Sequence, residues 1–452
     1  MNARLELLVS ALHDAPDRSF PGATRSDAEL EAAYRFFQNG RVTLDRLITP
    51  HIEATVARAR LTPDVLVLHD TTEFRFEGMK RREGLGKLAG DGQGFFGHFA
   101  LVVTERERAP LGLGGVVTYT RENAAYNRGR LSESERARRP SESIRWRDLI
   151  DDVNQRMGDL RPIHIMDREA DDFALFEHMC RNDMRFVARM NAVRHRRGKL
   201  DGDGDVVPVE AILDGSPIVA TREVFLTARP GKRGGSSEQA HPMRDRRLAT
   251  LAISAGRVEL QPPRWKRELR TPLTVSVVRV IEITAPDGEM PVEWTLVSTE
   301  PIETAEHVLR IVDAYRARWT IEEYFKALKT GCAIERRQLE SMHGLLAALG
   351  LFAPLAVRML ALRSYVRTDP NTPASAVLTR TDLLALKAIG RTPLSDSPTV
   401  RDALLAIAAL GGHLKRNGDP GWMTLARGFE KLQVAAEVIS SISVDTSRCD
   451  QS

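Results

Sequence analysis

Two acidic residues of this 452-residue chain end apolar segments, where their carboxylates could bind metal ions or take part in catalysis. Asp70 closes the apolar part of VLVLHDTT at 65–72, and Asp167 closes IHIMD at 163–167. A carboxylate at the mouth of a buried strand must be solvated, paired or metal-bound, because burying it bare is costly. Functional residues of α/β sheets gather at the ends of central strands, so the two should meet if their strands are neighbours. For each residue, a turn former or helix N-cap is the alternative.

A third acidic residue, Glu322, lies in a helical pattern that runs from Thr304 to Thr330. At about 100° per residue it falls on the apolar stripe that contains Val308 and Trp319, whereas its neighbour Glu323 does not. The same edge of the helix also carries a phenol and two cations, at Tyr315, Arg318 and Lys329. We therefore expect a core-facing carboxylate flanked by positive charge. A structural ion pair between residues 318 and 322, one turn apart, is the alternative.

Three blocks of sequence carry a family resemblance: DTT at 70–72, DREAD at 167–171 and YRARWTIEEYFKALKTG at 315–331. They resemble the signature blocks of bacterial DDE transposases of the Tn-five and IS-four type, and the last block is similar to the YREK motif of that family. Further similar segments extend the resemblance over almost the whole chain: EAAYRFFQN at 31–39, RFVAR at 185–189, EWTLVSTEP at 293–301 and GWMTLARGFEKL at 421–432.

The resemblance implies an α/β fold in which a β-rich insertion interrupts a ribonuclease-H-like core and helical domains flank it. The order of elements expected from the residues, β, β, β, α, β, α, β and then short strands and long helices, agrees with this. The expected parts are an N-terminal helical DNA-end-binding domain at 1–62, the first part of the catalytic core at 63–190, the β-rich basic insertion at 191–302, the core helix with the glutamate at 303–342 and a C-terminal helical dimerisation domain at 343–452.

By the same resemblance, Asp70, Asp167 and Glu322 are the catalytic residues and the ligands of two Mg²⁺ ions, for which Mn²⁺ can substitute. Three carboxylates within about 4 Å would repel by roughly 4 kcal/mol per pair at an effective dielectric constant near 20, and divalent cations reverse that repulsion. Ligands that offer only oxygen favour Mg²⁺ or Mn²⁺ over zinc. The implied reaction is hydrolytic nicking, hairpin formation and opening on the transposon end, and joining of its 3′ end to target DNA.

The implied partner is double-stranded DNA, both transposon ends and target, bound by a homodimer. The resemblance assigns DNA contacts to Tyr315, Arg318 and Lys329, to Arg189 and Trp294, and to Asp27, Glu31 and Arg35. From the pattern alone, a core indole is the better interpretation of Trp294, and an exposed strand arginine is the alternative for Arg189. Between residues 189 and 270 there are 17 Lys and Arg against 10 Asp and Glu, with clusters at 194–199, 231–235 and 263–267. Such loops suit phosphate contacts, although a solvated basic face is the alternative.

Composition sets the remaining expectations. With 42% hydrophobic and 28% charged residues, the chain is neither disordered nor fibrous. Its three cysteines are odd in number and far apart, which excludes a disulfide framework. The longest uncharged apolar run, Gly344 to Val357, is 14 residues long and too short to cross a bilayer, so we expect a buried helix and no membrane contact. The cysteines are consistent with a reducing cytosol, and the resemblance implies a bacterial cytoplasmic location with the protein on the nucleoid.

Two other functions stay open. The chain starts almost inside the segment that is similar to the family, at NARLELLVSAL, so the N-terminal domain is expected to be truncated or degenerate. This favours a catalytically idle, dimerising inhibitor of transposition. The three acidic residues favour a Mg²⁺-dependent transposase. A metal nuclease without strand transfer is the third alternative, and the similar C-terminal helices count against it.

Overall fold

The computed structural model describes residues 27–62, 64–78, 81–88, 92–121, 142–191, 196–200, 204–228, 243–263, 269–390, 393–414 and 418–449. The chain forms two compact units. The first unit comprises residues 1–65, 70–140 and 319–452, and the second comprises residues 66–69 and 141–318. The boundaries cut through one strand, β1 (Val65–Phe76), and through the helical segment that was expected to carry Glu322.

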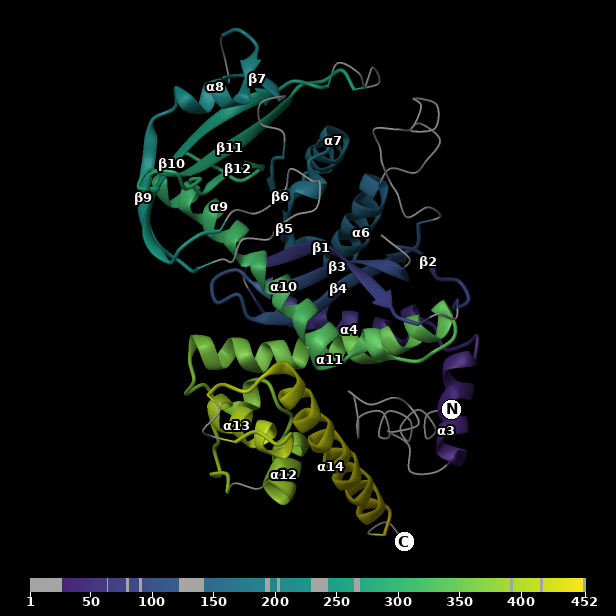
Figure 1. Cartoon of the computed structure of the whole chain (residues 1–452). Coiled ribbons are helices and arrows are strands. Elements are labelled where there is room, and N and C mark those ends of the chain that lie inside the picture. The colour runs from purple at the N-terminus through teal and green to yellow at the C-terminus, as the bar shows by residue number, and fades with distance from the viewer. Residues whose placement is uncertain are drawn as a thin grey trace. The chain divides into compact units, whose positions relative to one another are not determined.

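The second unit is a mixed β-sheet with helices packed on it (Figure 1). Starting from the β1 residues Leu66–His69, the strand order is β1-β5-β6-β12-β11-β10-β7-β8, and β9 also pairs with β10. The strands are β5 (Ile163–Met166), β6 (Arg185–Arg189), β7 (Arg197–Leu200), β8 (Val207–Pro208), β9 (Ile218–Leu226), β10 (Arg247–Leu260), β11 (Leu273–Glu282) and β12 (Glu293–Ser298). The helices are α6 (Glu142–Met157), α7 (Phe173–Arg181), α8 (Val209–Asp214) and α9 (Ala305–Ala317), with the 3-10 turns η2 (Gly158–Leu160) and η3 (Arg168–Ala170).

Three parallel strands form the start of this sheet. In β1 and β5, Leu66 pairs with Ile163, and β6 continues in parallel on the far side of β5. Every residue of β5 is buried, which explains its unbroken apolar sequence. One face packs against α7, where the rings of Phe176 and Phe186 stack with centroids 5.3 Å apart. The strands expected in the insertion extend the same sheet, because β12 pairs antiparallel with β6.

The first unit combines a small antiparallel sheet with most of the helices. The rest of β1 lies beside β3 (Gln93–Thr104), which also pairs with β2 (Gly86–Lys87) and β4 (Pro110–Tyr119). The helices are α3 (Asp27–Gln38), α4 (Leu44–Ala59), α10 (Trp319–Lys326), α11 (Met342–Thr368), α12 (Arg380–Ile389), α13 (Val400–Leu410) and α14 (Trp422–Cys449), with short turns η5 (Ala327–Gly331), η6 (Ile334–Arg336) and η7 (Ala374–Ala376).

Helix α11 contains the apolar run that was expected to form a buried helix. At 27 residues it is long and apolar enough to cross a membrane, but 78% of its most apolar window is buried inside the protein. It packs against α4, β4, α13 and α14 of the same unit (Figure 1). The prediction of a buried helix is confirmed, and the helix is longer than predicted.

The continuous helix expected from Thr304 to Thr330 is interrupted. Helix α9 ends at Ala317, and α10 begins at Trp319, where the two units divide. A π-helical turn, η5, then follows from Ala327. The prediction of a single apolar stripe is wrong at Trp319. This residue is 56% exposed, whereas Tyr315 is 8% exposed.

Candidate active site

Asp167 stands at the carboxyl end of a strand in the second unit, as the sequence predicted. Strand β5 ends with Met166, which pairs with Ala188 of the parallel strand β6. Asp167 and Arg189 are therefore the next residues along two neighbouring strands. One carboxylate oxygen of Asp167 accepts a hydrogen bond from the backbone N–H of Glu169, 2.9 Å away, and caps the turn η3. One oxygen of Asp167 therefore caps the following turn, as the alternative prediction for this residue expected.

Asp70 lies on β1. It is the first residue after the boundary at which that strand passes from the second unit to the first. On β1 and β5 the last recorded pair is Leu68 with Ile165, and Asp70 follows it by two positions on its strand, as Asp167 does on β5. A carboxylate oxygen of Asp70 accepts a hydrogen bond from the backbone N–H of Thr71 at 2.8 Å. Both aspartates thus follow the last recorded pair by two positions, but β1 continues to Phe76, so the prediction that Asp70 ends its strand is wrong.

Glu322 lies on α10 of the first unit and is half-buried, beside the buried side chain of Ile321. Within the described residues, no three His, Cys, Asp or Glu side chains form a group that could hold a metal ion. The three predicted ligands belong to different units, and their convergence stays a prediction. The donor chemistry nevertheless suits Mg²⁺ or Mn²⁺, because carboxylates offer only oxygen ligands.

Three predicted DNA contacts come together in the second unit, on the sheet face that α9 covers. Arg189 at the end of β6 pairs across the sheet with Leu296, and its guanidinium donates a hydrogen bond to the Glu293 carbonyl at 3.1 Å. It also hydrogen-bonds the hydroxyl of Tyr315 on α9. The rings of Tyr315 and Trp294 lie 5.9 Å apart. Trp294 is half-buried and packs on Tyr315. It is therefore not a fully buried core indole.

The charge around Arg189 is unusual. Burial lowers the pKa of Arg189; the phenol of Tyr315 opposes this shift, and the positive charges of Arg168 and Arg318 add to it. Among the described residues no carboxylate forms an ion pair with Arg189, and the positive charges of Arg168 and Arg318 lie within electrostatic reach of it. Such an arrangement favours a bound anion such as a phosphate.

Arg168 was missed by the sequence prediction. It is the second residue of the DREAD block, follows Asp167 directly, and is exposed at the start of η3. The turn η3 packs on β6, which brings Arg168 within electrostatic reach of Arg189. The signal was present in the sequence, since a cation next to a strand-end carboxylate is a candidate for a phosphate contact.

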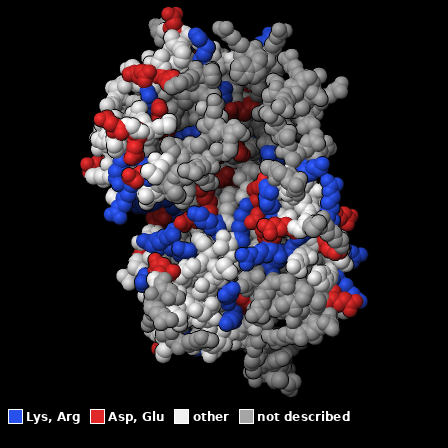
Figure 2. Space-filling view, in the orientation of Figure 1, with Lys and Arg blue, Asp and Glu red and all other residues white. Residues whose placement is uncertain are grey.

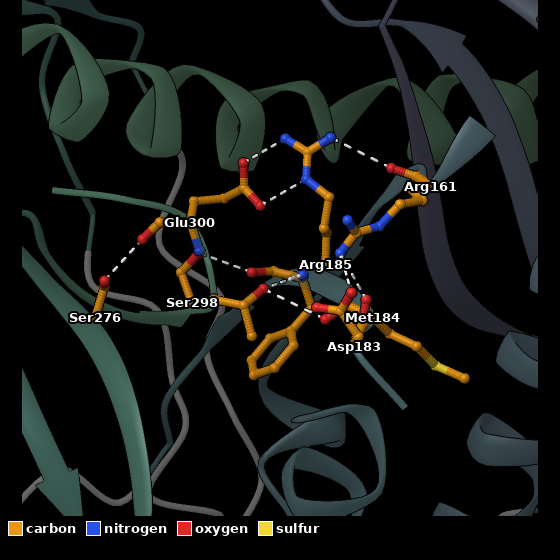
Figure 3. Close-up of polar contacts among 9 residues, drawn as sticks. Arg161, Asp183, Met184, Arg185, Ser276, Ser298 and Glu300 are labelled. Carbon is orange, nitrogen blue, oxygen red and sulfur yellow. Dashed lines mark hydrogen bonds and ion pairs between the residues drawn. The ribbon is translucent and has the colours of Figure 1, made fainter. Parts of the chain in front are cut away.

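A polar network joins strand β6 to the residues at the end of β12 (Figure 3). The guanidinium of Arg185 binds both oxygens of Glu300, at 2.9 and 2.5 Å, and donates to the Arg161 carbonyl at 3.2 Å. The hydroxyl of Ser298 donates to the Phe186 carbonyl at 2.7 Å. Glu300 is 5% exposed, so its carboxylate depends on Arg185 for a charged partner.

Lys329 is held differently, by residues of the first unit. Its ammonium group donates to the backbone carbonyl of Glu73 on β1 and lies 3.5 Å from a carboxylate oxygen of Glu335. It also sits 5.3 Å from the ring centre of Phe74. The predicted cation therefore lies against the strand that contains Asp70, and a protein carboxylate already balances its charge.

The predicted N-terminal contacts lie on α3. Helix α3 begins at Asp27, and Glu31 and Arg35 form an ion pair at 2.5 Å one turn apart, with both side chains well exposed. The basic clusters of the insertion fall mostly outside the described residues: all of 231–235 does, and so do most of 263–267 and part of 194–199. On the described surface of β9 and β10, acidic and basic side chains are intermixed (Figure 2).

Two protein-family models match the chain. Residues 1–42 match the family described as transposase DNA-binding, and residues 135–353 match the family described as transposase DDE domain. The chain belongs to the DDE transposases. The second match contains Asp167 and Glu322, together with Arg189 and its neighbours Arg168, Trp294, Tyr315 and Arg318. The first match contains the three predicted residues of α3. DNA is therefore the partner of this transposase.

One solved structure is reported among the similar chains, a piggyBac transposase synaptic complex with hairpin DNA determined by cryo-electron microscopy. It is 9% identical to this transposase, with 81% of this chain and 71% of the other covered, at a TM-score of 0.32. That TM-score is too low to bear on the fold, and the family assignment rests on the family models.

Proposed function

We propose that this transposase is a cut-and-paste enzyme of the Tn-five and IS-four type, in which Asp70, Asp167 and Glu322 are the catalytic carboxylates. The observation that carries the proposal is the edge of the parallel strands, where Asp167 and Arg189 follow paired residues on neighbouring strands and Asp70 occupies the corresponding position on β1. The carboxyl ends of parallel strands are the usual place for functional residues in such sheets.

The residues of this chain would bind and orient DNA at that edge. The guanidinium groups of Arg168, Arg189 and Arg318 offer planar donors to the phosphates of the transposon end, and Tyr315 holds Arg189 in place. The partly exposed ring of Trp294 offers a face on which an extruded base can stack. When bound, Mg²⁺ ions would activate the attacking oxygen and stabilise the leaving oxygen at phosphorus. The proposed working form is a homodimer on paired transposon ends.

A cleavage assay tests the proposal. The DNA substrate carries the short inverted repeats that flank the gene, and the purified chain is incubated with it and Mg²⁺. We expect nicking at the repeat ends, followed by hairpin products, and we expect Glu322→Gln to lower the rate by about a thousandfold or more, since loss of several kcal/mol of transition-state stabilisation is expected.

The control is Glu303→Gln, which alters an exposed carboxylate just before α9 that pairs with His307. It should cut like the wild type. Equal cutting by Glu322→Gln and the wild type would remove Glu322 from the mechanism. Nicking without hairpins would retain the catalytic carboxylates and reject the cut-and-paste route, and DNA binding without any cutting by the wild type would favour the idle inhibitor.

A further inference from the structure

Helix α10, which carries Glu322, is a short element between two local irregularities. It is eight residues long, the single residue Arg318, with helical backbone angles, separates it from α9, and the π-helical turn η5 follows it directly. Contacts along α10 therefore help to fix its rotation about its own axis, and a rotation of that helix would move the Glu322 carboxylate.

The apolar side of α10 packs on the first unit's sheet. The rings of Tyr324 and Phe325 both lie 5.6 Å from the ring of Phe99 on β3. Tyr324 is fully buried and Phe325 is 9% exposed. Ring contacts of this kind stabilise the helix, but flat apolar surfaces tolerate small rotations and slides better than directional bonds do.

A directional bond is present on the other side of the helix, at the residue next to Glu322. The Glu323 carboxylate accepts two hydrogen bonds from one guanidinium nitrogen of Arg367 near the end of α11, at 2.8 and 2.6 Å. At about 100° per residue, Glu323 points well away from Ile321, which lies on the buried face of α10. The ion pair and the ring contacts thus restrain α10 from different sides.

Arg367 itself is part of a supported row on α11. One turn earlier, the Arg363 guanidinium lies 4.3 Å from the ring centre of Trp422 at the start of α14. Burial lowers the pKa of Arg363, the positive charge of Arg367 lowers it further, and the negative charge of Glu323 opposes the shift. Arg363 therefore lies within electrostatic reach of Arg367 and Glu323, and its ring contact connects this group to the start of α14.

We propose that Arg367 is a positioning residue of the transposase, which acts through Glu323 to hold α10 in the rotation that presents Glu322 for metal binding. The inference rests on the proposed role of Glu322. Arg367 is 53% exposed and Glu323 22% exposed, so the pair contributes little to global stability and its effect should be local.

The test combines three measurements on full-length Arg367→Ala in complex with transposon-end DNA. We expect cleavage to fall by about 10- to 100-fold, as for other residues that orient metal ligands. The Mn²⁺ concentration that half-saturates the complex, measured by electron paramagnetic resonance, should rise by a similar factor. Amide hydrogen exchange of residues 319–326 should speed up, while the melting temperature and the DNA affinity stay at wild-type values.

Matched variants separate positioning from general damage. Glu323→Gln should behave like Arg367→Ala, and the exchange Glu323→Arg with Arg367→Glu should restore most of the Mn²⁺ affinity. Lys387→Ala breaks an exposed ion pair of the same unit, Lys387 with Asp396 at 2.9 Å, and should change nothing.

The outcomes are distinguishable. Wild-type Mn²⁺ binding and wild-type exchange in Arg367→Ala would overturn the inference while leaving the proposed function intact. A lowered melting temperature that accounts for the lost activity, or a charge exchange that restores nothing, would also overturn it. If the wild type fails to cut, or Glu322→Gln cuts normally, the proposed function falls and the inference falls with it.

Discussion

The segment similar to the YREK motif is divided between the two units, and the two halves are held by different means. In the second unit, Tyr315 takes its place from a sheet assembled by strands distant in sequence, and its partner Arg189 has no paired carboxylate among the described residues. In the first unit, Lys329 is balanced by Glu335 and by a backbone carbonyl. Lys329 thus has a protein carboxylate beside it, whereas Arg189 has none among the described residues.

The largest expected effect tests the predicted catalytic carboxylates, of which Asp167 lies in the second unit. Asp167→Asn keeps the shape and one capping acceptor of the side chain but removes its charge, so DNA cleavage should fall by about a thousandfold or more. Single-turnover cutting of transposon-end DNA measures it. The melting temperature should change little, and a variant that cuts at the wild-type rate would remove the second unit's carboxylate from the reaction.

The next largest effect concerns the contribution of the Arg185–Glu300 ion pair to the stability of the second unit. Arg185→Ala leaves the carboxylate of Glu300, 5% exposed, without its guanidinium, and should lower the free energy of unfolding by about 3 kcal/mol. Urea unfolding measures this change. Arg156→Ala, which breaks an exposed pair with Asp152 on α6, should cost less than about 1 kcal/mol. Equal losses would show that the ion pair in Figure 3 stabilises the second unit no more than an exposed pair does.

A smaller effect separates the two cationic sites directly. Arg189→Ala should weaken binding of transposon-end DNA by about tenfold and reduce the slope of log affinity against log salt by about 1. Lys329→Ala should weaken binding less, because Lys329 must give up an ion pair before it can bind a phosphate. Fluorescence anisotropy at several salt concentrations measures both variants. A larger loss with Lys329→Ala would reverse the comparison.

The smallest effect is a pH dependence in the first unit. His51 accepts a hydrogen bond from the backbone N–H of Leu113 at 3.1 Å, and burial, with a further contribution from the positive charge of Arg58, lowers its pKa from 6.5 to about 4. The unfolded state therefore binds this proton first as the pH falls. The associated stability is fully present above pH 6.5 and is lost between pH 6.5 and 4.

Urea unfolding at pH 7.5 and pH 5 measures that loss. His51 should account for up to about 1.4 kcal/mol per pH unit of the slope below pH 6.5. His51→Gln keeps an acceptor without a titrating group, so its unfolding free energy should depend less steeply on pH than that of the wild type. An unchanged slope would contradict the lowered pKa.

The sequence placed most of the elements, and the mixed α/β fold is confirmed. The apolar runs predicted the strand that ends before Asp167 and the first half of β1, which continues past Asp70 to Phe76. It failed at Trp319, because a helical wheel assumes one unbroken helix and the break after Ala317 ends that assumption. It also missed Arg168, whose importance depends on the turn η3 packing against β6.

What the sequence determined by itself is local: which segments alternate or cluster their apolar residues, where strands and helices end, and which ionisable side chains stand at those ends. Only the tertiary structure decided which side chains share an environment, such as Arg189 with Tyr315, or Glu323 with Arg367. The physical reason is range. Local backbone preferences act over a few residues, whereas burial and charge pairing depend on neighbours that the chain brings together from distant positions.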